Sequence, residues 1–158
     1  GLPANKMTSE SNRKKSFQVV LGIIIGSFII SLILFCIHTG GTRRVCCFRS
    51  FDSDRLCTEV RYFPRMNRIE AVEAFVQDLL LGPFTNRYKP IFASGTRLEF
   101  CFADGKTLYL GFSAQALKPE KEISDIDSNV QLIRKNIVKN FTNFNKICIF
   151  IDGVQVSG

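Results

Sequence analysis

The longest uninterrupted apolar stretch lies near the amino terminus. Residues 17–37 carry no charge, and their only polar side chains are Gln18, Ser27 and Ser31. A helix needs about 20 such residues to cross the ~30 Å hydrocarbon core of a bilayer. A helix in a protein core is rarely apolar on all sides over this length. The pattern therefore predicts a single transmembrane helix over residues 17–38.

Basic residues lie on both sides of this stretch. Lys6 and the block Arg13-Lys14-Lys15 precede it, and Arg43, Arg44 and Arg49 follow it. The apolar run exceeds the ~7–15 residues of a signal-peptide core, and no small-residue cleavage site follows, so we expect an uncleaved anchor. The positive-inside rule then favours, by a small margin, a cytoplasmic amino terminus. Met7 resembles a natural start, which leaves open whether residues 1–6 are native. We predict a cytoplasmic basic tail (1–16), the transmembrane helix (17–38), a linker (39–43) and an extracytoplasmic domain (44–158).

Beyond the linker, the spacing of apolar positions changes to that of strands and amphipathic helices. Residues 45–51 and 58–63 predict two strands joined by a polar turn. A helix follows, with Asn67 as its amino-terminal cap and Gly82-Pro83 as its stop. Its expected apolar face holds Ile69, Val72, Val76 and Leu79, with Phe75 and Leu80 beside them.

The second half of the domain repeats this order. Leu98, Phe100 and Phe102 alternate with other residues, and Asp104-Gly105 predicts a hairpin to a partner strand over residues 108–112. A second helix is expected to start at the capping box Ser124-x-x-Asp127, and a last strand covers residues 147–151. We expect Leu98, Phe100 and Phe102 to share one face of the sheet. The expected contacts of this face on the second helix are Val130, Ile133 and Ile137.

This order of elements predicts the fold class α+β. The two amphipathic helices must bury their apolar faces against the sheet, which gives a two-layer domain. We therefore expect a single transmembrane helix followed by two helices packed on a mostly antiparallel sheet, in the order strand-strand-helix-strand-strand-helix-strand.

Charge adds one feature to this picture. The 158-residue chain has a formal net charge of +7. Seven arginines against three acidic residues lie between Arg43 and Arg68, whereas basic and acidic residues cancel from Ile69 onward. This excess fits either an ordinary solvated strand face or attraction to anionic lipid head groups. Nucleic-acid binding is disfavoured because no recognition motif is present.

Residues that could support catalysis or metal binding are scarce. His38 is the only histidine, which excludes most histidine-based catalysis. Asp125-x-Asp127-x-Asn129 imitates the start of a calcium loop, but Val130 stands where the loop requires glycine, so we interpret it as a helix start. The cysteines form no C-x-x-C pair. The disulfide state of Cys46, Cys47 and Cys57 is left open. We expect no catalytic residues, no metal site, no cofactor and no enzymatic activity.

Several short motifs occur in the order typical of the GerM domain, the sporulation and spore germination domain. Residues 70–83 end in Leu79-Leu80-Leu81-Gly82-Pro83, which resembles the family's LL-x-GP signature. The segments 60–64, 95–98, 104–113 and 149–156 resemble its other landmarks, so the resemblance covers about residues 44–156. Two departures are the segment 143–146, which lacks the usual Pro-Gly turn, and an anchor where many members carry a lipoprotein signal.

The resemblance implies an extracytoplasmic, membrane-tethered, non-enzymatic protein with a fold similar to the ring-building motif. Members also occur in bacteria that make no spores, so a role in spores does not follow. We expect a scaffold or assembly module of a bacterial envelope complex. It would lie in the cytoplasmic (inner) membrane with its domain periplasmic or extracellular. The alternative is a sensory domain that binds a cell-wall fragment or a small molecule. The expected partners are membrane lipid, other envelope proteins and further copies of the chain.

Charged residues of the second helix give a candidate surface for self-assembly. A basic helix face and an acidic segment before it could meet between identical copies, head to tail. The members of this candidate interaction surface are Arg134, Lys135, Lys139, Glu120 and Glu122.

Overall fold

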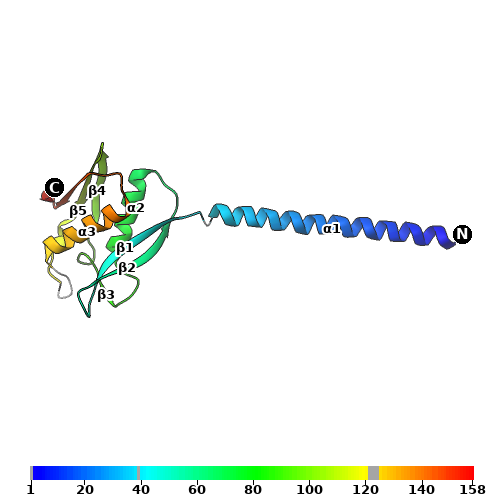
Figure 1. Cartoon of the computed structure of the whole chain (residues 1–158), viewed down its shortest axis with the longest axis horizontal. Helices are drawn as coiled ribbons and strands as arrows, with labels where there is room; N and C mark the ends of the chain where they lie inside the picture. Colours follow the sequence, from blue (N-terminus) through cyan, green and yellow to red (C-terminus); the bar gives the residue numbers. More distant parts are fainter. Residues whose placement is uncertain (1, 39, 121–124) are drawn as a thin grey trace. The chain divides into compact units, whose positions relative to one another are not determined.

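The computed structural model describes residues 2–38, 40–120 and 125–158, with side chains from Lys6 onward. The chain divides into two compact units, residues 1–40 and 41–158. Figure 1 shows the first as one helix and the second as a mixed helix-and-strand domain.

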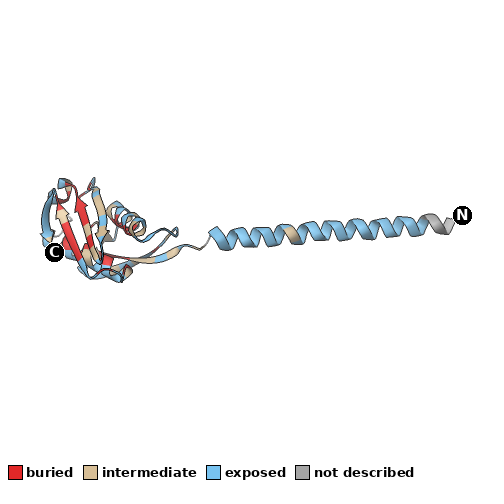
Figure 2. Cartoon of the chain, turned by 90° about the horizontal axis from the view of Figure 1, so that it is seen from above, coloured by how far each residue is buried: buried red, intermediate tan, exposed pale blue. Residues whose placement is uncertain are grey.

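The first unit is the helix α1 (Leu2–His38). Its apolar side chains are exposed, with Phe17 and Phe28 each about 70% accessible, and Figure 2 shows almost its whole length as exposed. Within the described part of the chain it is the one helix long and apolar enough to cross a membrane. It begins within the basic segment that we predicted as a separate tail.

The second unit contains two sheets. In the first sheet β1 (Thr42–Ser50) lies between β2 (Leu56–Phe63) and the two-residue β3 (Tyr88–Lys89), and both pairings are antiparallel. The second sheet has the order β4-β5-β6-β7 and is mixed, since β5 and β6 run parallel. Its strands are β4 (Leu98–Asp104), β5 (Thr107–Phe112), β6 (Lys146–Ile151) and β7 (Val154–Ser157).

Two helices contact both sheets. They are α2 (Arg68–Leu81) and α3 (Ile126–Asn140), and a short 3₁₀ helix, η1 (Ala114–Leu117), precedes α3. The α+β class is therefore confirmed. The strands form two sheets in place of the one we predicted, and β3 and β7 were not foreseen.

The helix ends follow from local side-chain chemistry. The Asn67 side chain accepts the Glu70 N–H at 2.9 Å, as expected of a cap, and α2 stops at Gly82, whose φ of +93° disfavours other residues. The cap of α3 is Asp125, whose carboxylate accepts the Ser128 N–H at 2.9 Å. The predicted capping box was therefore misplaced by one residue, and Ser124 lies outside the described residues.

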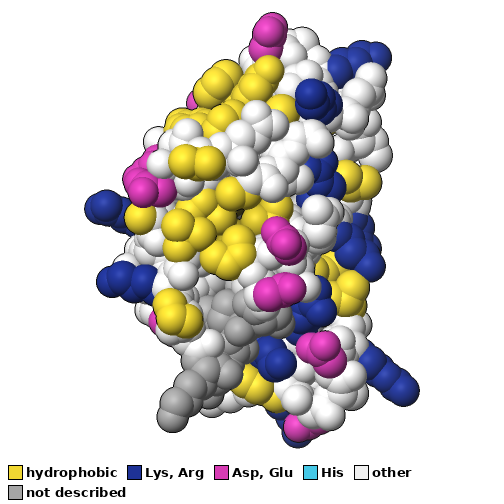
Figure 3. All heavy atoms as spheres, turned by 90° about the vertical axis from the view of Figure 1, so that its left-hand side faces the viewer, with side chains coloured by type: hydrophobic (Ala, Val, Ile, Leu, Met, Phe, Trp, Pro, Cys, Tyr) yellow, Lys and Arg dark blue, Asp and Glu magenta, His cyan; other side chains and the backbone are white. Residues whose placement is uncertain are grey.

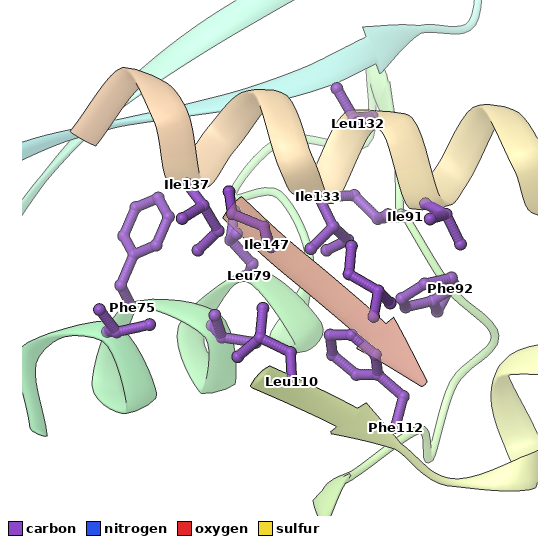
Figure 4. Packing of buried hydrophobic residues seen from close by; sticks show 14 of the residues in the cluster. Phe75, Leu79, Ile91, Phe92, Leu110, Phe112, Leu132, Ile133, Ile137 and Ile147 are labelled. Carbon is purple, nitrogen blue, oxygen red and sulfur yellow. The ribbon is translucent and has the colours of Figure 1, made fainter. Parts of the chain in front are cut away.

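The core lies where the inner faces of α2 and α3 meet the second sheet. Figure 4 shows Phe75 and Leu79 from α2 and Ile133 and Ile137 from α3 in the space between the two helices, next to β5 and β6. All four are at most 1% exposed. The helix periodicity in the sequence therefore identified the correct buried faces.

The predicted orientation of β4 is wrong. The strand contains a β-bulge: Leu98 pairs with Phe112, but Phe100 already pairs with the adjacent Gly111. An extra residue in one strand reverses the side-chain alternation beyond it. Cys101 therefore packs against the core. Phe102 is 50% exposed. Phe100 and Phe102 both lie away from α3, the helix they were predicted to contact.

These displaced aromatic rings pack together on the outer face of the second sheet. Phe100 lies 5.8 Å from both Phe102 and Phe150, measured between ring centroids, and Phe102 stacks on Tyr109 at 4.8 Å. The Phe100 ring covers Gly111 so closely that an added Cβ would lie 2.1 Å from it. Gly111 is therefore required by the close approach of this ring.

Candidate functional site

A buried arginine organises the turn that follows α2. Arg61 projects from the inner face of β2 and is 4% exposed. Its Nη1 donates to the Asp78 carboxylate at 2.5 Å and to the Asp78 carbonyl at 3.1 Å. Its Nη2 donates to Glu59 at 2.9 Å and to the Gly82 carbonyl at 2.7 Å. One guanidinium thus ties β2 to the end of α2 and to the Gly-Pro turn.

The same network fixes the residue after the turn. The Phe84 N–H donates to both oxygens of the Glu59 carboxylate, at 3.1 and 3.2 Å. The Arg61 guanidinium carbon lies 4.0 Å from the centroid of the Phe84 ring, which is a cation–π distance. Burial lowers the pKa of Arg61, but its hydrogen bonds to Asp78 and Glu59 outweigh this and raise the pKa above its ordinary value. The arginine is therefore a permanent cation at the base of the turn.

This rigid turn exposes two large apolar side chains. Leu81 is 85% exposed and Phe84 is 78% exposed. Exposed apolar side chains are common on proteins when they are scattered and mobile. Here they stand three residues apart on backbone that a buried ion network holds in place. We call Leu81, Gly82, Pro83 and Phe84 the apolar turn.

A shallow groove of about 440 Å³ lies beside the apolar turn. Its apolar walls include Leu80, Phe92 and Phe51, and at its border the Glu120 carboxylate accepts the Ser94 N–H at 3.2 Å. Thr85 and Asn86 also line it. The groove surface is thus a mixture of polar and apolar groups.

The structure separates the residues of the predicted assembly surface. Arg134 donates a hydrogen bond to Ser157 on β7, whereas the Lys139 ammonium lies 3.8 Å from the Cys47 sulfur of β1. Lys135 is exposed between them. Glu120 borders the groove, and Glu122 lies outside the described residues. The head-to-tail contact between these groups stays a prediction.

The described residues offer little for catalysis. Across residues 2–38, 40–120 and 125–158 there is no group of three or more His, Cys, Asp or Glu side chains that could hold a metal ion. The six cysteines, Cys46, Cys47 and Cys57 among them, are free thiols. Asp125 caps α3, as the interpretation of its segment as a helix start requires.

The surface charge is mixed on the face that Figure 3 presents. Basic and acidic side chains are interspersed there, with apolar groups between them, and neither sign covers a large area. This face therefore lacks the single-sign field that steers nucleic acids.

Sequence reasoning missed the residues that build the apolar turn. Arg61 occupies an inward position of a strand, between the outward-facing Val60 and Tyr62. A charged residue at an inward position requires a buried partner. The inward position of Arg61 in the strand's alternation could therefore have predicted a buried ion pair. The sequence alone does not identify Glu59 and Asp78 as the partners.

Comparison with known proteins gives one family match and two informative structures. The family model "Sporulation and spore germination" matches residues 47–157. The first GerMN domain of the sporulation protein GerM from Bacillus subtilis aligns with a TM-score of 0.58 at 15% identity, covering 73% of this chain and 86% of that one. The tandem GerMN domains of the same protein align with a TM-score of 0.59 at 15% identity, covering 74% and 41%. Comparison with curated protein sequences gives no match. At this identity the two structures establish the fold alone.

Proposed function

This chain belongs to the Germane family of sporulation and spore germination proteins, and on that premise we propose a function for it. It is a non-catalytic, membrane-anchored scaffold or assembly module of a bacterial envelope complex. The observation that carries the proposal is the apolar turn. A buried cation with two carboxylates holds Leu81 and Phe84 in solvent, where neither contributes to the core. Fixed, exposed apolar and aromatic side chains are the usual anchors of protein–protein contacts.

The anchor in this proposal is α1. Its uncharged run of residues 17–37 follows the basic block 13–15, and the positive-inside rule then leaves the amino terminus in the cytoplasm. The domain of residues 44–158 would lie outside the cytoplasmic membrane. Protease added to intact spheroplasts should digest a carboxyl-terminal epitope while a cytoplasmic marker stays intact. An epitope protected until lysis would refute this orientation.

The contact role can be tested at the turn itself. A photo-crosslinking amino acid at Phe84 or Leu81 in the full chain should give discrete adducts with envelope proteins in living cells. Leu117 is a matched control, since it is an apolar residue 47% exposed on η1. Equal adduct patterns at all three positions would remove the apolar turn as the contact site.

The groove beside the turn supports the alternative of a ligand-binding domain. Its polar groups at Glu120 and Ser94 could orient a cell-wall fragment against Leu80 and Phe92. Calorimetry with a muropeptide digest tests this, with Glu120→Gln as the variant and Glu99→Gln as a control on an exposed carboxylate. Saturable binding that Glu120→Gln alone weakens would favour the sensory role. No binding would favour the scaffold.

A further inference from the structure

The strand edges of this domain are protected unequally. The side of β1 that faces away from β2 is occupied by α3: the Asn136 amide binds the backbone of Cys47, and the Asn140 amide binds that of Val45. Farther along the same edge, β3 pairs with Arg49 and Ser50. This edge is closed to another strand.

The second sheet protects its edges by a bulge, by a short edge strand and by charge. β4 carries the bulge between Leu98 and Phe100, and Glu99 and Asp104 place carboxylates along it. β7 has four residues and a break in register opposite β6. Bulges, short strands and charges are the devices by which proteins prevent edge-to-edge pairing.

The outer edge of β2 is neither short nor bulged, and its two charged side chains, Glu59 and Arg61, lie on the inner face of the sheet. The strand is eight residues long and pairs with β1 without a register shift. Among the described residues, no segment other than β1 hydrogen-bonds to its backbone. Its outward side chains are uncharged: Leu56 and Val60 are 41% exposed and Tyr62 is 71% exposed, with Thr58 between them. A long, regular edge with an uncharged outer face is a template for another strand.

We propose that β2 pairs antiparallel with β2 of a second copy of this chain, centred on Val60, to form one continuous sheet across a twofold axis. In this register Val60 faces its own equivalent and Thr58 faces Tyr62 of the other copy. On the inner face, Glu59 of one copy stands opposite Arg61 of the other, so opposite charges meet twice. Pairing β4 with itself about its centre, Cys101, would instead set Glu99 against Ala103 and Asp104 against Leu98, so no opposite charges would meet. The pattern of charges therefore selects β2.

This inference rests on the proposed function and names one partner of the scaffold, namely itself. An isologous pair is closed, so it yields a dimer and no filament. The head-to-tail contact through α3 would give rings or open chains, which makes the two mechanisms distinguishable by stoichiometry.

The test uses the full chain in mild detergent, with Cys36→Ser and Cys57→Ser to remove the more accessible thiols. Under gentle oxidation, Val60→Cys should form a covalent dimer, because directly opposed residues lie ~4.5–5.5 Å apart between Cα atoms. Thr58→Cys alone should not, because its equivalents are offset by four residues, ~13 Å along the strands. A mixture of Thr58→Cys and Tyr62→Cys chains should crosslink.

A second variant measures pairing without a crosslink. Val60→Lys should weaken the dimer by up to about fivefold in light scattering, since like charges would then face each other across the axis. Arg134→Glu with Lys135→Glu should leave it unchanged. Equal crosslinking of Val60→Cys and Thr58→Cys, or a dimer sensitive only to the α3 reversal, would overturn the proposal. A monomeric chain that still gives adducts at Phe84 would refute this pairing and leave the scaffold role intact.

Discussion

The Asn136 side chain on α3 takes the place of a neighbouring strand for Cys47 on β1. Its Oδ1 accepts the Cys47 N–H at 2.7 Å, and its Nδ2 donates to the Cys47 carbonyl at 3.0 Å. Asn136 is fully buried. One helical turn later Asn140 repeats the pattern with Val45, at 2.8 Å for each bond. Two amides at i and i+4 thus satisfy an edge of the first sheet.

Replacing Asn136 should therefore be costly. Asn136→Leu fills the space but leaves the buried Cys47 N–H and carbonyl without partners, at about 1–3 kcal/mol each. Asn140→Ala should cost less, because its site is only partly buried and water can replace the amide. Urea unfolding followed by tyrosine fluorescence reports on this domain alone, since the three tyrosines lie in β2, β3 and β5. A loss of less than 1 kcal/mol for Asn136→Leu would show that the edge finds other partners.

Arg61 should contribute to stability mainly through its two carboxylate partners. Arg61→Met leaves both Glu59 and Asp78 without their cation, and removing one member of a buried ion network typically costs about 3–5 kcal/mol. Adding Glu59→Gln and Asp78→Asn should recover part of this loss, because the uncompensated charges are then removed. If the triple variant were no more stable than Arg61→Met in the same urea titration, the penalty would come from lost packing and hydrogen bonds.

The helices of this fold could be predicted because their signals are local. Asn67 and Gly82 bound α2 by side-chain hydrogen bonding and by a positive φ, both of which depend on residue type at one position. The apolar spacing then fixes which side of each helix is buried. Phe75 and Ile133 both face the core for this reason.

The course of β4 could not be predicted in the same way. Its alternation of Leu98, Phe100 and Phe102 is compatible with one continuous face, and a single extra residue at the bulge reverses that face. The bulge depends on how the backbone pairs with Gly111, which lies in another strand. The apolar turn also escaped prediction, because Arg61, Asp78 and Gly82 come together only when β2 packs against the end of α2.

The contact between Phe100 and Gly111 allows a direct test of the bulge. Gly111→Ala should destabilise the domain by about 1–3 kcal/mol, because the new methyl group overlaps the ring. In a Phe100→Ala background the same change should be nearly neutral, so the double-mutant cycle should show coupling. Phe100→Ala alone should cost less than Phe112→Ala, whose fully buried ring is worth about 3–5 kcal/mol. Additive effects in the cycle would show that the Phe100 ring does not contact Gly111.

Thiol reactivity should separate the cysteines by burial. Burial raises the pKa of Cys46 to about 11, although the nearby Arg61 cation lowers it, and burial likewise raises the pKa of Cys101 to about 11. Since the thiolate is the reactive form, only about one molecule in a thousand would be ionised at each site at pH 8. Cys57 is less buried than Cys46 and should react with maleimide before it, as measured by peptide mass spectrometry over time. Labelling of Cys46 should stay slow in the folded chain and increase with pH toward 11. Equal rates for Cys46 and Cys57 at pH 8 would show that β1 opens far more readily than its buried contacts with α3 imply.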